Sequence, residues 1–385
     1  MAGHLALLVT DFWNPLGRRA GRFLGSGVLK RAAERFHPEI PSSKVRVPLR
    51  AHIRALAAAS GRRPLGESLA RLSVTLARES ARWADRCDHD TLFTFCGAAL
   101  EVIEREKALG NRVILDQFDT GRELANTLRE ESERYKSLGA SYPQYPDWYY
   151  DRLDEEWRLA DQIVVNSDWT RQCLTGCGVP AGKIALIPLS VTATQPVDKP
   201  KRMSGGRLRV LWLGRMCLGK GLVYAVEAAR AVSGLPIEFT FAGIPAVDVT
   251  RIDWPANCRV IGHVPRSAVD ELYRSHELLL FPTLNDGFGR VQIEAALHGL
   301  PIIATERCGS VVEHNRSGYV VPARSSQAIA ECLAGLLCRP HLLEEMSLAA
   351  LAGVTRFSEN QVWPRLNAVI AGAMKAGVPE EVTCG

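Results

Sequence analysis

Two basic and two acidic side chains in the second half of the chain have the types and spacing of a ligand-binding site. The stretch GRMCLGKG places Arg215 and Lys220 in a Gly-containing loop directly after the apolar run LRVLWL. The stretch DGFGRVQIE then places Asp286 in a Gly-rich turn and Glu294 eight residues later. An arginine can hold a diphosphate through two hydrogen bonds and a lysine acts as a point charge, while carboxylates accept hydrogen bonds from a polyol. The pattern predicts a site for a ligand with both phosphates and hydroxyl groups.

The elements around the two carboxylates should place both in one cleft. Gly287 and Gly289 can take positive φ angles and let backbone N–H groups approach a ligand closely. From Arg290 the pattern RVQIEAALHG is helical and ends at a glycine. Glu294 then lies about one turn inside this helix and can face the same cleft as the acidic residue of the turn. The helix N-terminus adds further donors for a phosphate.

Plainer interpretations of the same residues stay open. Arg215 and Lys220 would then be surface residues after a strand, Asp286 a helix cap and Glu294 a solvated helix residue. The spacing of the glycines fits neither the dinucleotide pattern GxGxxG nor the P-loop pattern GxxxxGK[ST]. A dinucleotide site or a P-loop is therefore not expected here.

Short apolar runs alternate with helical patterns in both halves of the chain, which is typical of parallel sheets in α/β domains. Residues 191–206 are rich in Pro, Lys, Thr and Gly and are the best linker candidate. Residues 141–150, with two prolines and several aromatic residues, are expected to be a loop. The expected strands are residues 5–10, 91–95, 112–116, 162–166 and 183–189 before the linker, and 208–213, 237–243, 259–264, 277–281, 301–305 and 318–322 after it.

The composition fits a globular protein of two domains. The chain has 385 residues, of which 46% are hydrophobic and 23% charged. Its ten cysteines include no CxxC pair, so we expect reduced thiols in a cytoplasmic protein rather than a disulfide or metal framework. The opening MAGHLALLVTDFW does not resemble a signal peptide, and no apolar run is long enough to span a bilayer.

Positive charge is concentrated near the N-terminus. The formal net charge is +5, and residues 1–86 hold about sixteen Lys and Arg against about six Asp and Glu. This bias fits either a solvated surface or a face for an anionic membrane or for acidic ligands. It comes with no recognisable RNP, helix-turn-helix or zinc pattern, so a nucleic-acid partner is not expected.

These motifs together resemble one family. GRMCLGKG, followed at about seventy residues by DGFGRVQIEAALHGLPIIAT and then GSVVEHNRSGYVVP, resembles the retaining glycosyltransferases of family 4, the glycosyl transferases group 1. RLADQIVVNSDWTRQCLTGCGVPAGKIALIPLSV resembles an earlier stretch of the same family. The resemblance implies an α/β GT-B fold with two Rossmann-like domains facing across a cleft. We expect an N-terminal acceptor-binding domain over 1–195, a donor-binding domain over 196–360, and a C-terminal helix and tail over 361–385 that returns toward the first domain.

The resemblance also implies roles for the four charged residues. Arg215 and Lys220 would grip the donor diphosphate, Asp286 would contact the donor sugar, and Glu294 would hold the ribose hydroxyls. Asp286 stands where the family has a Glu, one methylene longer, which leaves the identity of the sugar open. The other expected donor contacts are Gly17, Gly214, Gly287, Phe288, Gly289, Arg290 and Val291, with Gly262, His263 and Val264 where the base usually stacks.

The first half departs from the family pattern in two places. The loop after the first strand has Gly17 but lacks the usual paired glycine, and Arg18 and Arg19 beside it are either phosphate contacts or surface residues. The segment where the family often has a His carries Asp116, Asp119 and Arg122 instead. These three are candidate sugar or acceptor contacts, and the alternative is turn and helix-cap chemistry.

The implied activity is transfer of a sugar from a nucleoside diphosphate, UDP or GDP among others, to an acceptor hydroxyl, with retention at the anomeric carbon. The setting would be polysaccharide, glycolipid or glycoconjugate synthesis, in the cytoplasm or on the cytoplasmic face of a membrane. We expect no metal and no cofactor beyond the nucleotide-sugar, because the two cations can neutralise the leaving diphosphate. The alternatives are a GT-B nucleotide-sugar epimerase and a catalytically silent nucleotide-sugar-binding subunit.

Overall fold

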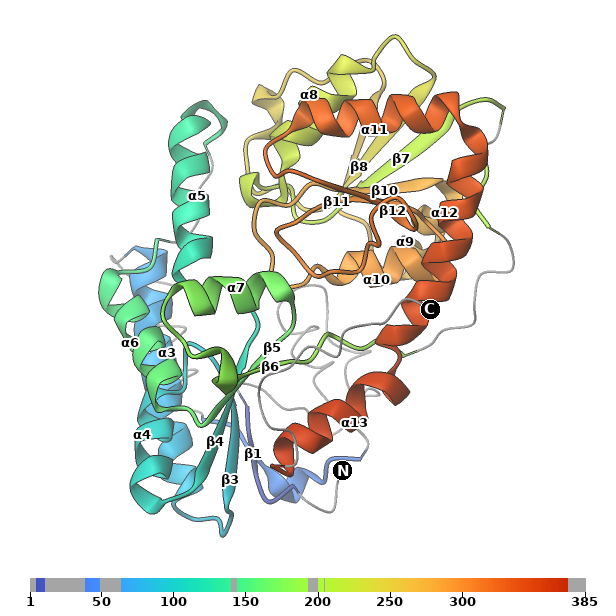
Figure 1. The fold of residues 1–385 in the computed structure, drawn as a ribbon. Coiled ribbons are helices and arrows are strands. Elements are labelled where there is room, and N and C mark those ends of the chain that lie inside the picture. Colours follow the sequence, from blue (N-terminus) through green and yellow to red (C-terminus); the bar gives the residue numbers. More distant parts are fainter. Residues whose placement is uncertain are drawn as a thin grey trace. The chain divides into compact units, whose positions relative to one another are not determined.

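The computed structural model describes residues 5–10, 39–48, 64–139, 144–192, 200–203 and 205–372 (Figure 1). By its internal contacts the chain divides into two units. The first comprises residues 1–116 and 143–163, and the second comprises residues 117–142 and 164–385. The predicted Gly17, Arg18 and Arg19 lie outside the described residues, as does most of the Arg-rich N-terminal region.

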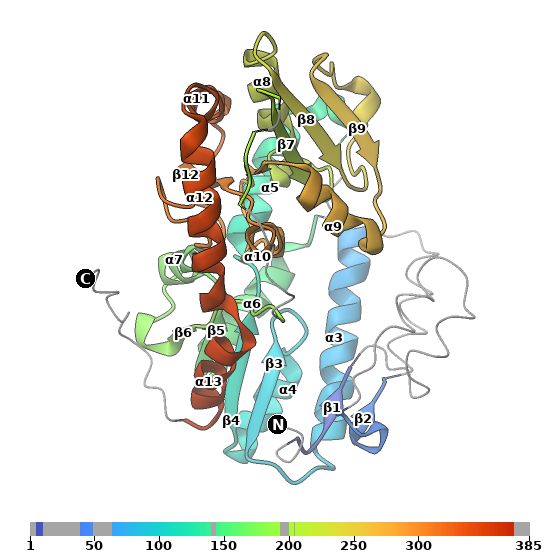
Figure 2. The same ribbon diagram turned by 90° about the vertical axis from the view of Figure 1, so that its right-hand side faces the viewer.

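The second unit is built on a six-stranded parallel sheet with helices packed against it (Figures 1 and 2). The strands are β7 (Leu208–Leu213), β8 (Ile237–Ala242), β9 (Cys258–Gly262), β10 (Leu278–Phe281), β11 (Ile302–Thr305) and β12 (Gly318–Val321). The central strands β10 and β11 are apolar and buried on both faces, as the helix-covered strands of a parallel sheet must be, whereas β9 at the edge is partly exposed. The helices are α8 (Leu222–Ala231), α9 (Arg266–Ser275), α10 (Arg290–Leu297), α11 (Ser326–Cys338), α12 (Pro340–Gly353) and α13 (Glu359–Ile370).

The strand order of this sheet locates a binding edge. The order is β12-β11-β10-β7-β8-β9. The chain therefore starts in the middle at β7, moves outward to β9, and returns to the other side of β7 with β10. This is the doubly wound order in which ligands bind outside the carboxyl ends of the strands where the direction of winding reverses. That point lies between β7 and β10, which pair in parallel.

Segments from the first half of the sequence are grouped with this unit by their contacts. They carry α5 (Arg122–Arg134), α7 (Asp168–Gly176) and β6 (Ile184–Leu186). On α5, the Glu131 carboxylate accepts hydrogen bonds from Arg324 at 2.7 Å and from Tyr224 at 3.0 Å. The predicted N-terminal domain over 1–195 includes residues 117–142 and 164–192, which the internal contacts group with the second unit. The functional domain limits at 195 and 360 stay predictions.

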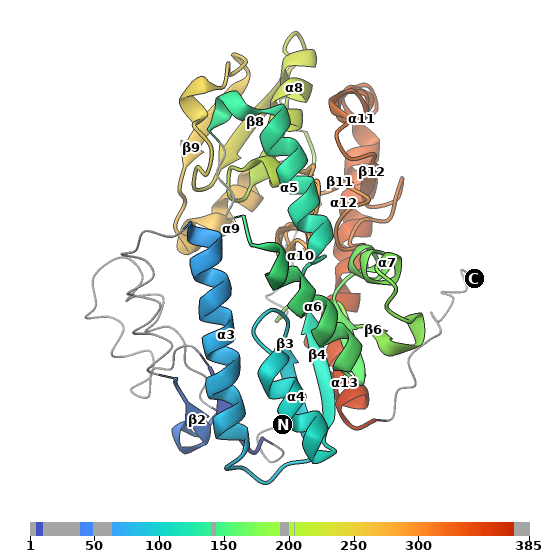
Figure 3. The same ribbon diagram turned by 90° about the vertical axis from the view of Figure 1, so that its left-hand side faces the viewer.

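The first unit contains β1 (Leu8–Val9), β2 (Val45–Arg46), β3 (Thr91–Phe95) and β4 (Arg112–Gln117), with β1 parallel to β2 and β3 parallel to β4. The sheet that begins with β3 and β4 has the order β3-β4-β5-β6, with β5 at Gln162–Val165, and its last strand, β6, is grouped with the second unit by its contacts. Helix α4 (Leu100–Leu109) packs against α3 (Leu65–Ala84) and α6 (Asp147–Leu159) (Figure 3).

The buried carboxylate of Glu156 holds the turn between β3 and α4 in the first unit. Glu156 of α6 accepts backbone hydrogen bonds from Gly97, Ala99 and Leu100 at 2.7–3.0 Å, at the N-terminus of α4. A carboxylate at this end of a helix satisfies donors that have no partner within the helix and complements the helix dipole. The turn between β3 and α4 is therefore held by a side chain of the same unit.

The predicted strands are found, several of them shorter than expected. β3 and β7 match their predicted bounds, whereas β1 covers only two of the six residues in 5–10. The predicted loop over 141–150 is wrong at its end, because α6 begins at Asp147 with Pro146 as its N-cap. The 20-residue helix α3 was not anticipated. In the part of the chain that the structure describes, no helix is both long and apolar enough to cross a bilayer, and the cysteines are free thiols.

Candidate active site

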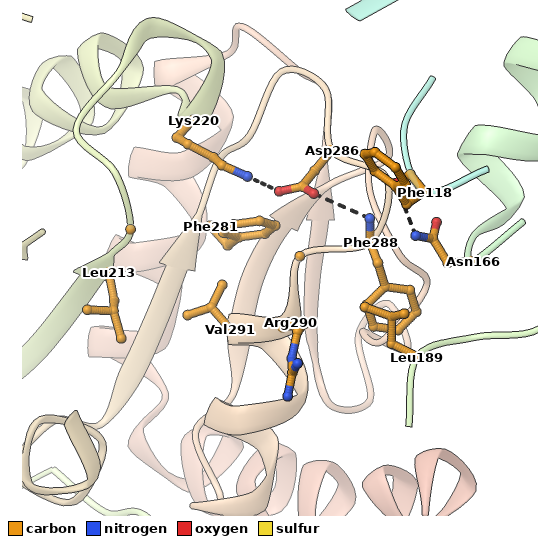
Figure 4. Close-up of a pocket in the computed structure, with 12 residues that line it drawn as sticks. Phe118, Asn166, Leu189, Leu213, Lys220, Phe281, Asp286, Phe288, Arg290 and Val291 are labelled. Carbon is orange, nitrogen blue, oxygen red and sulfur yellow. Dashed lines mark hydrogen bonds and ion pairs between the residues drawn. The ribbon is translucent and has the colours of Figure 1, made fainter. Parts of the chain in front are cut away.

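A pocket of about 350 Å³ opens at the carboxyl ends of β7 and β10, where the winding of the sheet reverses (Figure 4). Its size lies within the usual range for small-molecule sites. Its wall is mainly apolar, with a few charged and polar groups, as is usual for such sites. The lining residues are Phe118, Asn166, Leu189, Leu213, Gly214, Lys220, Phe281, Asp286, Phe288, Gly289, Arg290 and Val291. All of them belong to the second unit.

The pocket brings Lys220 and Asp286 together. Lys220 ends a short 3-10 helix after β7, and its ammonium group forms an ion pair with the Asp286 carboxylate (Figure 4). The Lys220 Nζ also lies 5.6 Å from the centre of the Phe281 ring, within reach of a cation–π interaction. The side chains of Lys220 and Asp286 are 31% and 16% exposed, so a ligand can reach the pair from the pocket.

A close backbone approach places Lys220 beside β10. The residue after it, Gly221, has a φ of 68° and precedes α8. A Cβ at Gly221 would lie 1.8 Å from the carbonyl oxygen of Pro282. Only glycine fits this position, and this contact brings the loop after β7 against the end of β10.

The turn from 284 to 289 is folded around its acidic residue. The Asp286 carboxylate accepts a hydrogen bond from the Phe288 N–H at 3.3 Å, and the Asp286 N–H donates to the carbonyl of Arg307 at 3.0 Å. Gly289 then starts α10 with a φ of 82°, and a Cβ there would lie 2.5 Å from the Phe281 ring. Among the described residues, no side-chain hydrogen bond caps α10, whose first residues, Arg290 and Val291, line the pocket.

Glu294 lies one turn further along α10 and does not line this pocket. Its carboxylate accepts hydrogen bonds from Arg266 at 2.9 Å and from Tyr273 at 3.1 Å, both on α9. The hydrogen bond to Glu294 raises the pKa of Arg266, and burial followed by the charge of Glu294 raises the pKa of Tyr273. Glu294 is therefore fixed in position, with its side chain 17% exposed.

The remaining predicted donor contacts fall into two groups. Gly214, Phe288, Gly289, Arg290 and Val291 line the pocket. Arg215 and His263 are exposed and do not line it, nor do Gly262, which ends β9, and Val264, which lies just after it. The Arg215 side chain forms no hydrogen bond or ion pair with any part of the chain that is described here. In Figure 4 the Arg290 guanidinium points away from the Lys220–Asp286 pair.

The three candidates at the end of β4 differ in their surroundings. Burial raises the pKa of Asp116 to about 6, and the structure gives its carboxylate no partner within the described ranges. Asp119 accepts hydrogen bonds from the Gly121 N–H and the Gln117 side chain, both at 2.9 Å, and burial raises its pKa despite these bonds. Its contacts are those of a turn. Arg122 is the first residue of α5.

Sequence reasoning missed several residues of the pocket. Phe118, Asn166, Leu189 and Phe281 line it, and Asn285 lies directly beside Asp286. Asn166 and Phe281 each stand at the carboxyl end of a strand, and that position was the available signal. Phe118 directly follows β4 and so carried the same signal, and Leu189 ended the predicted strand 183–189, although only the tertiary fold brings both to β7.

The chemistry of the pocket fits an anionic, hydroxyl-rich ligand. Lys220 supplies positive charge, the turn and α10 supply N–H donors, and Asp286 supplies an acceptor. No group of three or more His, Cys, Asp or Glu side chains suitable for a metal ion is found among the residues described. The expected metal independence stays a prediction.

Known proteins share both the sequence pattern and the fold. Residues 207–339 match the family model described as glycosyl transferases group 1. The chain is 27% identical over 214 residues to the amylovoran biosynthesis glycosyltransferase AmsK of Erwinia amylovora, an alignment that covers 51% of this chain and 53% of AmsK. It is 24% identical over 229 residues to the putative colanic acid biosynthesis glycosyltransferase WcaL of Escherichia coli K12, covering 55% and 56%. The chain thus spans about half the length of these curated relatives.

A solved structure extends the similarity to the whole fold. HepE of Anabaena, in complex with UDP-glucose, superposes with a TM-score of 0.62 at 15% identity, covering 95% of this chain and 98% of that one. At this identity the likeness establishes the fold alone. Residues 207–339 therefore carry the sequence pattern of the group 1 glycosyl transferases, and the chain has an α/β GT-B fold.

Proposed function

We propose that the protein is a retaining glycosyltransferase that moves a sugar from a nucleoside diphosphate to an acceptor hydroxyl in polysaccharide biosynthesis. The observation that carries the proposal is the pocket at the switch point between β7 and β10, with Lys220 and Asp286 at its wall. The proposal is supported by the names of the relatives, which act in amylovoran and colanic acid synthesis, and by HepE, which binds UDP-glucose.

In this proposal Lys220 acts on the leaving group. The bond between the anomeric carbon and the diphosphate oxygen breaks, and a bond from the same face of that carbon to the acceptor oxygen forms. The proton of the acceptor hydroxyl passes to the departing phosphate. The ammonium group of Lys220 stabilises the negative charge that develops on the diphosphate, together with the N–H groups at the start of α10. Arg215, which is exposed, adds a second cation when it turns toward the phosphates.

The two carboxylates hold the two sugars of the donor. Asp286 accepts hydrogen bonds from hydroxyls of the transferred sugar, and Glu294 accepts hydrogen bonds from the ribose hydroxyls. Glu294 is prepared for this by Arg266 and Tyr273, which fix the carboxylate before a ligand arrives. Lys220→Ala or Glu294→Ala should then lower turnover by orders of magnitude and leave the fold intact.

The test is a transfer assay with a panel of donors. The purified chain is incubated with UDP-, GDP- and ADP-sugars and with polysaccharide or lipid-linked acceptors, and the anomeric configuration of the product is read by NMR. UDP-sugars come first because HepE binds UDP-glucose. A product with the donor's anomeric configuration supports the proposal. Conversion of the donor without an acceptor would indicate an epimerase, and binding without any transfer would indicate a silent binding subunit.

We further propose that the enzyme works at the cytoplasmic face of a membrane, because the first 86 residues are rich in Lys and Arg. In α3, the described helix of this region, Arg71 and Arg82 pair with Glu67 and Glu79. This helix therefore offers less free positive charge than its sequence suggests. Sedimentation with vesicles of anionic lipid tests the idea: salt-sensitive pelleting supports it, and no pelleting at low salt rejects it.

A further inference from the structure

The residue before Asp286 is buried and makes three hydrogen bonds through its amide. Asn285 is 4% exposed. Its Oδ1 accepts from Thr120 Oγ1 at 2.7 Å and from Trp169 Nε1 at 3.2 Å, and its Nδ2 donates to Thr127 Oγ1 at 3.3 Å. Thr120 precedes α5, Thr127 lies within it, and Trp169 lies in α7. One side chain therefore ties the pocket turn to two elements more than a hundred residues away in sequence.

The residue after Asp286 is tied to the same elements. The Gly287 carbonyl accepts from Thr170 Oγ1 at 3.4 Å. A Cβ at Gly287 would lie 1.8 Å from the carbonyl oxygen of Phe118, so the two backbones touch and only glycine fits. The Phe118 carbonyl is itself held by the Asn166 amide at 3.1 Å. Asp286 thus lies between two residues that are both held by contacts to residues outside the turn.

The turn has few bonds of its own. Within it, the Asp286 carboxylate and the Phe288 N–H are 3.3 Å apart, which is long for a hydrogen bond to a charged group. The firmer anchors run from Leu284 N–H to the Gly219 carbonyl at 2.9 Å and from Asp286 N–H to the Arg307 carbonyl at 3.0 Å. Neither of these fixes the side-chain direction of Asp286. The contacts on both neighbours hold the backbone that carries the Asp286 side chain, whose carboxylate pairs with Lys220.

We propose that Asn285 is a positioning residue for the transfer reaction: through Thr120, Thr127 and Trp169 it holds the Asp286 carboxylate toward Lys220 and the bound sugar. The inference rests on the proposed function. A buried amide held by three hydrogen bonds has little freedom to move, and a small misplacement of a group that contacts the reacting sugar is costly to the rate. We call Asn285 and its three partners the clamp. Loosening the clamp should lower turnover, whereas nucleotide binding through Lys220 and Glu294 should change little.

Two conservative variants loosen the clamp without removing Asn285. Thr120→Val removes the hydroxyl at the same side-chain size, and Trp169→Phe removes the indole N–H while keeping an aromatic ring. Their matched controls are Thr75→Val, where a buried hydroxyl bonds only within α3, and Trp254→Phe, whose N–H donates to the Val249 carbonyl. Each clamp variant should lower kcat roughly tenfold, with KM for the donor changed less than about twofold. The controls should stay near the parent value.

A double-mutant cycle separates positioning from general damage. In an Asp286→Asn background, Thr120→Val should change kcat by less than about twofold, because the group it positions is already altered. A full tenfold further loss in that background would overturn the inference. So would equal losses in the clamp and control variants.

Hydrogen exchange tests the clamp without relying on activity. Deuterium uptake in a peptide spanning residues 284–292 should rise in Thr120→Val and Trp169→Phe and stay unchanged in both controls. Unchanged uptake in the clamp variants would reject the inference even in an active enzyme. Raised uptake in a protein that transfers no sugar would reject the proposed function and keep the clamp as a structural fact.

Discussion

The Lys220 ammonium group is paired with the Asp286 carboxylate, and both line the pocket where β7 and β10 end. The two charges neutralise each other, so an anionic ligand that approaches Lys220 must compete with Asp286. Because the pair is partly exposed, its own strength is modest, on the order of 1 kcal/mol. A diphosphate, with more charge and more acceptors than one carboxylate, can displace it.

Replacing Asp286 with Asn should separate binding from catalysis. The substitution frees Lys220 and removes a negative charge near the phosphates, so affinity for the bare nucleoside diphosphate should rise about two- to fivefold. Sugar transfer should fall, because the acceptor for the sugar hydroxyls is weakened. Isothermal titration with UDP and a turnover assay measure the two effects. Asp161→Asn, which alters the Lys107–Asp161 pair with its comparably exposed lysine, is the control. Weaker nucleotide binding in Asp286→Asn would contradict the competition between carboxylate and phosphate.

Glu294→Gln should weaken only the part of nucleotide binding that depends on the ribose hydroxyls. Loss of one charged acceptor should weaken UDP binding about tenfold, since hydrogen bonds to charged groups contribute about 1.5–3 kcal/mol. Binding of 2′,3′-dideoxy-UDP, which lacks the ribose hydroxyls, should be nearly the same in both proteins. Tyr273→Phe should show a smaller loss of the same kind, because it removes one of the two donors that orient Glu294. Equal weakening for UDP and the dideoxy nucleotide would exclude the assigned role.

Gly289→Ala should be more damaging than an alanine at another left-handed glycine. Gly289 and Gly110 have φ angles of 82° and 81°, so alanine is strained by about 1 kcal/mol at each. At Gly110 nothing lies within 4 Å of the added methyl group, whereas at Gly289 it would lie 2.5 Å from the Phe281 ring. Gly289→Ala should therefore cost a further 1–3 kcal/mol or so and shift the turn. Thermal melting of both variants tests this. Equal shifts in Tm would show that the Phe281 ring can move away from the added methyl group at little cost.

Asp116 should make stability depend on pH. Its folded pKa of about 6 lies above the ordinary value near 4, so the folded state favours the neutral acid. The stability from this group is present below pH 4 and is lost as the pH rises through 6. Asp116→Asn stays neutral at both pH values. Its free energy of unfolding should exceed that of the parent by about 1–3 kcal/mol at pH 8 and should be nearly equal to it at pH 4. Urea titrations at both pH values provide the test, with the exposed Asp88→Asn as control. A constant difference between the two pH values would contradict the assignment.

The fold of the second unit was largely predictable because its signals are local. The buried strands are short apolar runs, and glycines and prolines mark their ends, so the bounds of β7 were found directly. The buried face of helix α3 is hard to recognise in its sequence. Its buried positions include small residues such as Ala70 and Ala77, and many of its other residues are charged. The predicted loop extends past the start of α6 because proline is common in loops and also at helix starts, and Pro146 is the N-cap of this helix.

The candidate site was predictable only where its chemistry is carried by adjacent residues. Lys220 and Asp286 could be named from their loops, and the structure brings them into contact. Asn285 and its partner Thr120 are 165 positions apart, and no local pattern connects them. The switch point between β7 and β10 likewise depends on strand order, which becomes visible only when the sheet is assembled.

The most direct measurement is the affinity of Lys220→Ala for UDP, GDP and ADP by isothermal titration. Lys107→Ala is the matched control, since Lys107 is 33% exposed and also paired with an aspartate, but lies in the other unit. We predict that the parent and Lys107→Ala bind one of the three nucleotides alike and that Lys220→Ala binds it at least about tenfold more weakly, as expected for a lost charge-assisted contact. Equal affinities in all three proteins would show that the pocket between β7 and β10 is not the donor site.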